Sequence, residues 1–211
     1  MTPNGLFDWG AWSAVEQEIL RVKEEQRLAQ TQPAMPYLCL HPDSAAFLYQ
    51  VAVATAAKSI VEVGTNAGYS ALWLARACAS TGGRVLTVEK EPHFAEVARD
   101  YLARAGATDW VEVRVGDARS LLAEEKRTWD LAFLDAAKDE YVAYAQAVWP
   151  RLRVGGSLLA DNVSSHADAT RPYREYLLSL TDAHTITVPL GNGLAWTVKT
   201  GGASPSSPAG G

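Results

Sequence analysis

Short apolar runs alternate with longer segments of helical period along most of the chain. Five runs rich in aliphatic and β-branched residues predict strands, namely "SIVEV", "RVLTV", "VEVRV", "WDLAFL" and "GSLLA". Such continuous apolar character is typical of strands buried on both faces, and the intervening helices would cover those faces. The pattern therefore predicts an α/β protein built on a mostly parallel sheet.

Helical periodicity is clearest in "PHFAEVARDYLARAG", which begins with Pro92 and ends at Gly106. An N-terminal helix is expected over roughly residues 11 to 29, with Phe7 and Trp9 just ahead of it. One face of this helix carries Trp12, Val15, Ile19 and Val22. An apolar stripe of this kind is typical of core packing, and it could also close a homodimer.

The last third of the chain predicts a helix and a hairpin. "RPYREYLLSL" places Pro172 in the first turn of a helix, and "HTITVPLGNGLAWTVK" predicts two strands joined across residues 191–193. The closing "GGASPSSPAGG", residues 201–211, is expected to be a flexible tail. We expect one domain over residues 1–200, with an N-terminal helical region that extends to about residue 57.

Composition narrows the range of partners. The chain has 211 residues, of which 48% are hydrophobic and 20% are charged, as in an ordinary globular domain. Its formal net charge of −5 and the absence of a long basic run argue against nucleic acid and membrane surfaces. The longest apolar stretch, "FLYQVAVATAA", is too short to span a bilayer, and the opening residues carry no signal core, so we expect a cytoplasmic protein. Cys39 and Cys78 are expected to be buried apolar residues.

The segment "VEVGTNAGYSALWLA" reads as a strand, a glycine-bearing turn and a helix, the place where an open parallel sheet accepts a nucleotide-like ligand. Gly64 and Gly68 would let the backbone approach that ligand closely. Their spacing differs from GxGxxG, which weakens the case for a dinucleotide.

Polar residues at the next strand ends indicate which ligand is bound. Glu89 ends the second strand, where a carboxylate can accept hydrogen bonds from both ribose hydroxyls. Asp117 and Ala118 follow the third strand and would lie beside an adenine ring, although Asp117 suits a helix N-cap equally well. Together with Glu62 and Gly64 after the first strand, these residues predict an adenosine site.

At this point the sequence resembles a known family. "GYSALWLA", "LDAAKDEY" and "ADNV" occur in order, and the similarity to the cation-dependent O-methyltransferases, which include catechol and caffeoyl-coenzyme A O-methyltransferases, covers about residues 35 to 199. It implies a Rossmann-like class I methyltransferase fold with a seven-stranded sheet, its last strand antiparallel, and S-adenosylmethionine as methyl donor. By position it places the donor site on Leu40, Glu62, Gly64, Thr65, Ser70, Glu89 and Ala118. Asp117 and Asp135 complete the predicted donor site, and Leu40 lies in a segment without the family's usual glycine.

Two strand ends supply oxygen ligands at the same edge of the predicted sheet. Asp135 ends "WDLAFLD", and Asp161 with Asn162 ends "GSLLADN". Mg²⁺ prefers oxygen ligands and usually takes only one or two carboxylates, which leaves positions for water and substrate. We therefore expect a divalent cation, Mg²⁺ by preference, held by Asp135, Asp161 and Asn162.

The resemblance also predicts the chemistry. It places Lys138 as general base beside Asp135, acting on a hydroxyl of a phenolic, catechol-like or other vicinal dihydroxy small molecule. Many relatives have a second carboxylate where this chain has Ala137, and the short loop "SSHADA" leaves open whether His166 touches the acceptor. Two alternatives remain: the same reaction on a hydroxylated tRNA uridine, which the acidic balance disfavours, and a non-catalytic module that only binds S-adenosylmethionine.

Overall fold

The computed structural model of the chain describes residues 9–29 and 33–201. Within this part, seven strands form one sheet in the order β3-β2-β1-β4-β5-β7-β6. The strands are β1 (Ser59–Val63), β2 (Arg84–Glu89), β3 (Val111–Val115), β4 (Trp129–Leu134), β5 (Leu152–Ala160), β6 (Ala183–Val188) and β7 (Leu194–Lys199). Strands β1 to β5 pair in parallel, whereas β7 runs antiparallel to both β5 and β6. The predicted sheet, with its antiparallel last strand, is confirmed.

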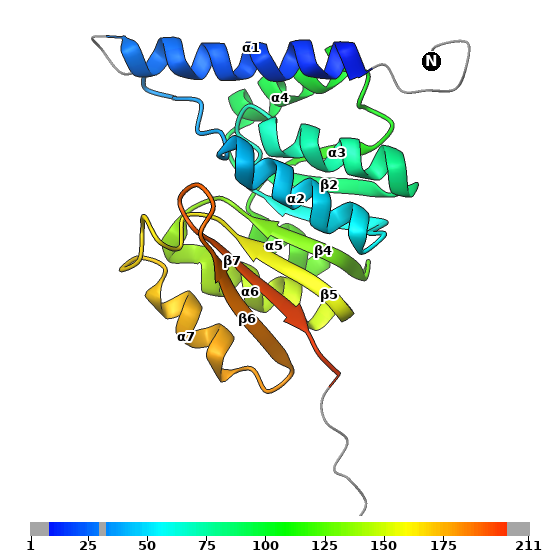
Figure 1. Ribbon diagram of the computed structural model, residues 1–211, viewed down its shortest axis with the longest axis vertical. Helices are drawn as coiled ribbons and strands as arrows, with labels where there is room; N and C mark the ends of the chain where they lie inside the picture. Colours follow the sequence, from blue (N-terminus) through cyan, green and yellow to red (C-terminus); the bar gives the residue numbers. More distant parts are fainter. Residues whose placement is uncertain (1–8, 30–32, 202–211) are drawn as a thin grey trace, which may run out of the picture.

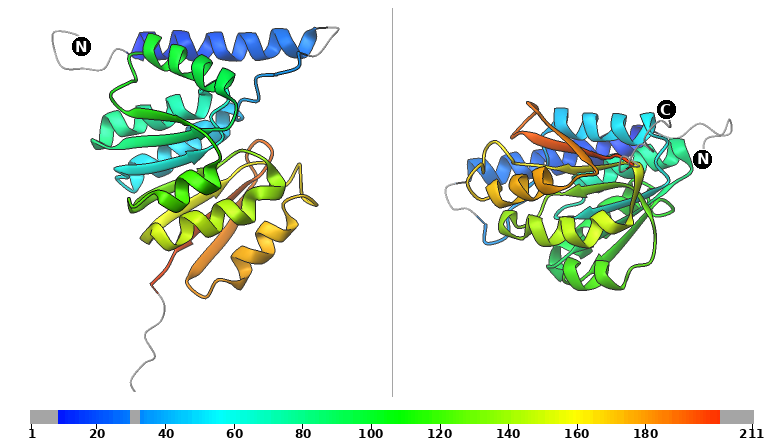
Figure 2. Two further views of the ribbon diagram at one scale, coloured as in Figure 1. Left: turned by 180° about the vertical axis from the view of Figure 1, so that it is seen from behind. Right: turned by 90° about the horizontal axis from the view of Figure 1, so that it is seen from below.

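Helices cover both faces of this sheet (Figures 1 and 2). They are α1 (Trp9–Leu28), α2 (Pro42–Ala54), α3 (Tyr69–Thr81), α4 (Pro92–Arg104), α5 (Ala118–Glu124), α6 (Tyr141–Val148) and α7 (Arg171–Ser179), with short 3₁₀ turns η1 (Lys138–Glu140) and η2 (Trp149–Arg151). The first four helices share a core with one face of the sheet, and α5, α6 and α7 share a core with the other. The predicted helices at 92–105 and 171–180 are confirmed.

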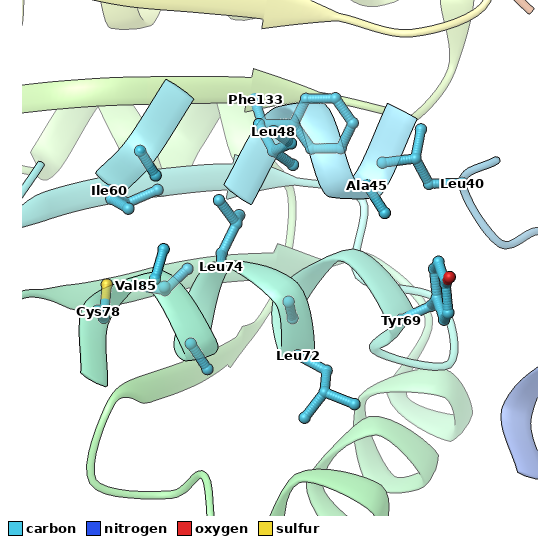
Figure 3. Packing of buried hydrophobic residues seen from close by; sticks show 14 of the residues in the cluster. Leu40, Ala45, Leu48, Ile60, Tyr69, Leu72, Leu74, Cys78, Val85 and Phe133 are labelled. Atoms are coloured by element: carbon cyan, nitrogen blue, oxygen red, sulfur yellow. The ribbon is translucent and has the colours of Figure 1, made fainter. Parts of the chain in front are cut away.

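Strand alternation explains how the sheet supports two cores. In β1, Ile60 belongs to the core beneath α2 and α3, while its neighbour Val61 belongs to the core beneath α5 and α6. Figure 3 shows side chains of α2 and α3, such as Leu48 and Leu74, in one layer with Ile60 of the sheet. Both faces are buried, as the continuous apolar strands predict.

Helix α1 lies across α3 and α4 (Figure 1). Its predicted stripe is a packing surface, because Trp12 and Val15 are 3% and 4% exposed and Ile19 is fully buried. The Trp12 ring lies 5.7 Å from the ring of Trp110, which precedes β3. The helix begins at Trp9, so Trp9 belongs to it rather than preceding it.

The start of β5 differs from the prediction, and two predicted terminal features cannot be compared with the structure. Strand β5 begins at Leu152 rather than at Gly156, because a register irregularity between β4 and β5 lets the chain pass Gly155 and Gly156 while the strand continues. Phe7 and residues 202–211 of the expected tail lie outside the described residues. Of the helices that are described, none is long and apolar enough to cross a bilayer.

Candidate active site

A cavity of about 660 Å³ opens at the carboxyl ends of the parallel strands. Its wall includes nearly all residues that the sequence predicts for the site, namely Leu40, Gly64, Thr65, Ser70, Glu89, Asp117, Ala118, Asp135, Lys138, Asp161 and Asn162. The strand order explains this convergence, because β1 lies between β2 and β4 and the loops after these three strands meet there. Glu62 is the predicted residue that does not line the cavity.

The turn after β1 requires glycine at position 64. Gly64 has φ of +96°, and a Cβ atom there would lie 2.2 Å from the carbonyl oxygen of Asp135. Its N–H donates to the Val88 carbonyl of β2 at 2.9 Å. The backbone segments after β1 and β4 therefore touch. The turn at Gly64, where the sequence predicts donor binding, lies against the predicted metal ligand Asp135.

The Glu89 carboxylate lines the cavity and also accepts hydrogen bonds from the protein backbone. It accepts N–H groups from Thr65 at 3.1 Å, Asn66 at 2.8 Å and Glu91 at 2.9 Å. A carboxylate offers about four acceptor positions, so capacity remains for a ribose hydroxyl. Sequence reasoning assigned Glu89 to the ligand alone and missed that it also shapes the first loop.

Asp117 caps helix α5, as the alternative interpretation of this residue anticipates. Its carboxylate accepts the Arg119 N–H at 2.8 Å, and both of its oxygens are paired with the Arg119 guanidinium. These contacts hold the pKa of the Asp117 carboxyl well below its usual range. Asp117 still lines the cavity, next to Ala118, but its carboxylate is already well supplied with donors.

Glu62 lies in β1, just before the turn at Gly64, and is fully buried. The Thr87 hydroxyl donates to its Oε2 at 2.6 Å, while Oε1 is buried without a hydrogen-bond partner. Burial raises the pKa of Glu62 to about 7, against the opposing effect of the nearby Ser70 and Thr87 hydroxyls. The structure thus places Glu62 in the buried interior rather than in the cavity wall.

Asp135 and Asp161 face the same part of the cavity. Lys138 Nζ lies 2.9 Å from Asp135 Oδ1. Asp161 is 2% exposed, and its Oδ1 is buried without a hydrogen-bond partner. Burial, with a further contribution from the negative charge of Asp135, raises the pKa of Asp161 to about 7. Two neighbouring carboxyls with one unsatisfied oxygen are an arrangement that a bound cation would relieve.

The donor set is small for a metal centre. The described residues contain no group of three or more His, Cys, Asp and Glu side chains that could hold a metal ion. The predicted ligands are two carboxylates and one amide, and oxygen ligands of this number suit Mg²⁺, which keeps several waters. Asp135, Asp161 and Asn162 therefore fit a hydrated Mg²⁺ ion better than a cation that needs a full protein cage.

The β6–β7 hairpin supports the turn that carries Asp161 and Asn162. The Asn192 carbonyl accepts the N–H groups of Ser164 and Ser165, each at 3.1 Å. A Cβ atom at Gly193 would lie 2.1 Å from the Ser164 hydroxyl oxygen, so only glycine allows this approach. Asn192 also lines the cavity, a position that the sequence indicated only as a hairpin tip.

Further lining residues come from the N-terminal region, namely Lys23, Leu38 and Cys39. Cys39 is partly exposed in the cavity wall, which corrects the expectation of a buried residue, whereas Cys78 is buried as expected. Lys23 reaches the cavity from α1, and no motif in the sequence marks it. His166 and Ala137 also line the cavity, on the side of Lys138 and Asn162.

Known proteins with this sequence pattern and fold transfer methyl groups. The profile of the O-methyltransferase family matches residues 11–176. A catechol O-methyltransferase of Niastella koreensis is 36% identical over 154 residues, which cover 69% of this chain and 69% of that protein. A catechol O-methyltransferase of Mycobacterium tuberculosis is 42% identical over 130 residues, 61% of this chain and 59% of that protein.

A solved structure extends the similarity to nearly the whole fold. The O-methyltransferase from Bacillus cereus, determined in complex with SAH (S-adenosylhomocysteine), superposes with a TM-score of 0.75 and 27% identity over 89% of this chain and 91% of that chain. The family profile, the relatives and this superposition agree with the strand-end site described above. The chain belongs to the O-methyltransferase family and is an enzyme of the catechol and caffeoyl-coenzyme A type.

Proposed function

We propose that this enzyme uses S-adenosylmethionine and a divalent cation to methylate one hydroxyl of a catechol-like or other vicinal dihydroxy small molecule. The observation that carries the proposal is the buried, unpartnered Asp161 Oδ1 beside the Asp135–Lys138 pair in one cavity. Asp135 also contacts the donor loop through Gly64, so donor and acceptor chemistry would meet at this residue.

The residues that follow β1, β2 and β3 support the proposal that S-adenosylmethionine binds at this part of the cavity. Glu89 retains acceptor capacity for a ribose hydroxyl, and Ala118 offers a small apolar surface next to it. Lys90 follows Glu89 and also lines the cavity, and the spacing of Gly64 and Gly68 differs from the GxGxxG pattern of diphosphate-binding turns. An adenosine with a short, zwitterionic tail suits this wall better than a dinucleotide.

The residues at β4 and β5 would bind and orient the acceptor. Lys138 would be the general base that accepts the proton of the hydroxyl that is methylated, because its amine lines the cavity beside the proposed metal ligands. The hydroxyl oxygen then bonds to the methyl carbon, the carbon–sulfur bond breaks, and its electron pair returns to sulfur to give S-adenosylhomocysteine. Much of the acceleration would come from holding oxygen and methyl carbon in line.

Asp135, Asp161 and Asn162 would hold the divalent cation. When bound, that cation supplies Lewis-acid stabilisation of a deprotonated hydroxyl near neutral pH. The protein contributes the geometry, because the Tyr141 hydroxyl donates to the backbone carbonyls of Leu134 and Asp161 at 3.1 and 3.2 Å and ties the two ligand-bearing strand ends together.

The test is methyl transfer from labelled S-adenosylmethionine to catechol with Mg²⁺, and then with a chelator. We expect activity that needs the cation, and we expect Asp161→Ala to abolish it while S-adenosylhomocysteine binding is largely retained. Asp168→Asn is the matched control, since it removes an exposed carboxylate from the same segment of chain. Full turnover of Asp161→Ala, or of the unmodified enzyme in chelator, would show that the metal assignment is wrong.

A further inference from the structure

Lys23 is a cation in the cavity wall that the proposed reaction does not use. It lies on α1, remote in sequence from the strand-end motifs, and its Nζ donates to the Cys39 carbonyl at 2.9 Å. A lysine ammonium has three donors, so this bond leaves two of them for another partner. The side chain is partly buried, which reduces the screening of its charge by water.

The other lysines of the wall are already accounted for. Lys138 is paired with Asp135, and Lys90 directly follows Glu89 at the proposed ribose end. Lys23 forms no ion pair with any residue in the described part of the chain. Its charge is nevertheless felt at the acceptor end, because it opposes the rise in pKa that burial causes in Asp135 and Asp161.

An apolar surface lies beside this cation. Leu38 lines the cavity and exposes 68% of its surface, and its N–H is fixed by Asn66 Oδ1 at 2.9 Å. An exposed leucine in a cavity wall is a surface that an aromatic ring can cover. Lys23 and Leu38 are thus held near each other, since Lys23 is bonded to the residue that follows Leu38.

From this juxtaposition we infer that Lys23 is a specificity-determining residue that binds a carboxylate on the acceptor ring, so that carboxylated catechols are preferred to neutral ones. The inference rests on the proposed function, which commits Asp135 and Asp161 to the cation, so that Lys23, which forms no ion pair among the described residues, can pair with a charge on the acceptor. In the resulting arrangement the vicinal hydroxyls face Asp135 and Lys138, the ring covers Leu38, and the carboxylate reaches the Lys23 amine.

The test compares 3,4-dihydroxybenzoate with 3,4-dihydroxybenzamide, which has a similar shape and no charge. Calorimetry of the Mg²⁺-loaded, S-adenosylhomocysteine-saturated protein measures the affinity for each ring, and steady-state kinetics measure kcat and KM. Lys23→Met should weaken binding of the acid about tenfold and raise its KM, with less than about a twofold effect on the amide. Lys23→Arg should keep most of the preference for the acid, because it keeps the charge.

Lys126→Met is the matched control, because it removes an exposed lysine in the chain between α5 and β4. If Lys23→Met weakens both rings equally, or weakens S-adenosylhomocysteine itself, Lys23 serves the N-terminal segment or the donor's carboxylate and the inference is wrong. If the unmodified enzyme binds and methylates both rings without preferring the acid, the Lys23 assignment alone fails. If the unmodified enzyme binds and methylates neither ring, both the proposed function and the inference about Lys23 are wrong.

Discussion

Glu62 should ionise in the folded protein only at a pH well above its ordinary range, and Glu62→Gln tests this directly. The side chain is fully buried, with one oxygen bonded to the Thr87 hydroxyl and the other without a partner. Ionisation would therefore place a charge where only part of its hydration is replaced. Glutamine keeps the shape and the acceptor toward Thr87 but cannot ionise.

The size of the stability change follows from the difference in the pKa of Glu62 between the folded and the unfolded state. The pKa of Glu62 is about 7 in the fold against an ordinary value of 4.5, so the folded state binds this proton more tightly than the unfolded chain. The stabilisation that the protonated Glu62 carboxyl gives to the fold is fully present below about pH 4.5 and is lost as the pH rises through about 7. At about 1.4 kcal/mol per pKa unit, the loss amounts to about 3 kcal/mol.

The assay is urea unfolding of both proteins at pH 5 and pH 8, in chelator and without donor. The free energy of unfolding of Glu62→Gln, relative to the unmodified protein, should rise by about 2 to 3 kcal/mol between the two pH values, because part of the loss already lies below pH 5. The unpaired amide of glutamine adds a penalty that does not depend on pH, so it cancels from this comparison. Glu96→Gln, on the exposed face of α4, should show no such change. A difference that stays constant from pH 5 to pH 8 would refute a raised pKa for Glu62.

Three other predictions address the loops around the cavity. Gly64→Ala should cost about 3 kcal/mol in urea unfolding, because a Cβ atom meets the Asp135 carbonyl; Gly82→Ala, with φ of +73° but open space, should cost only about 1 kcal/mol, and equal losses would contradict this contact. Glu89→Ala should weaken calorimetric S-adenosylhomocysteine binding by about 10- to 100-fold, since a charged acceptor is lost, and unchanged affinity would remove Glu89 from the donor site. Catechol should be methylated with higher kcat and lower KM than phenol, because two adjacent oxygens anchor it; equal rates would argue against chelation of the acceptor.

The strand-end residues could be predicted because their positions depend on local signals. Apolar runs mark where each strand ends, and parallel strands deliver the residues after them to one edge of the sheet. This is why Glu89, Asp135 and Asp161 could be assigned to one site from the sequence alone. The hydrogen bonds of Glu89 were beyond this reasoning, because they depend on how the loop after β1 folds back onto β2.

The position of Lys23 in the cavity wall could not be predicted from the sequence. An apolar stripe predicts its helix, and Lys23 lies at the edge of that stripe, four residues after Ile19, where a lysine usually extends its charged end into solvent. Its place in the cavity depends on how α1 packs on α3 and α4 and how the chain returns to Leu38 and Cys39. Neither arrangement leaves a periodic signal in the sequence, because both are tertiary contacts between elements that are distant along the chain.

The antiparallel last strand shapes the part of the cavity that carries Asp161 and Asn162. Because β7 runs opposite to β5, the hairpin that precedes it lies at the same end of the sheet as the carboxyl terminus of β5, and Ala195 pairs with Ala160. The hairpin then supports the next residues of the chain, since the Gly193 carbonyl accepts the Val163 N–H at 3.0 Å. A parallel strand in this place would present its carboxyl terminus, not a tight turn, beside Asp161. The strand topology thus orders the turn that holds Asp161 and Asn162, and the hairpin residues 189–193 that support this turn carry no charge.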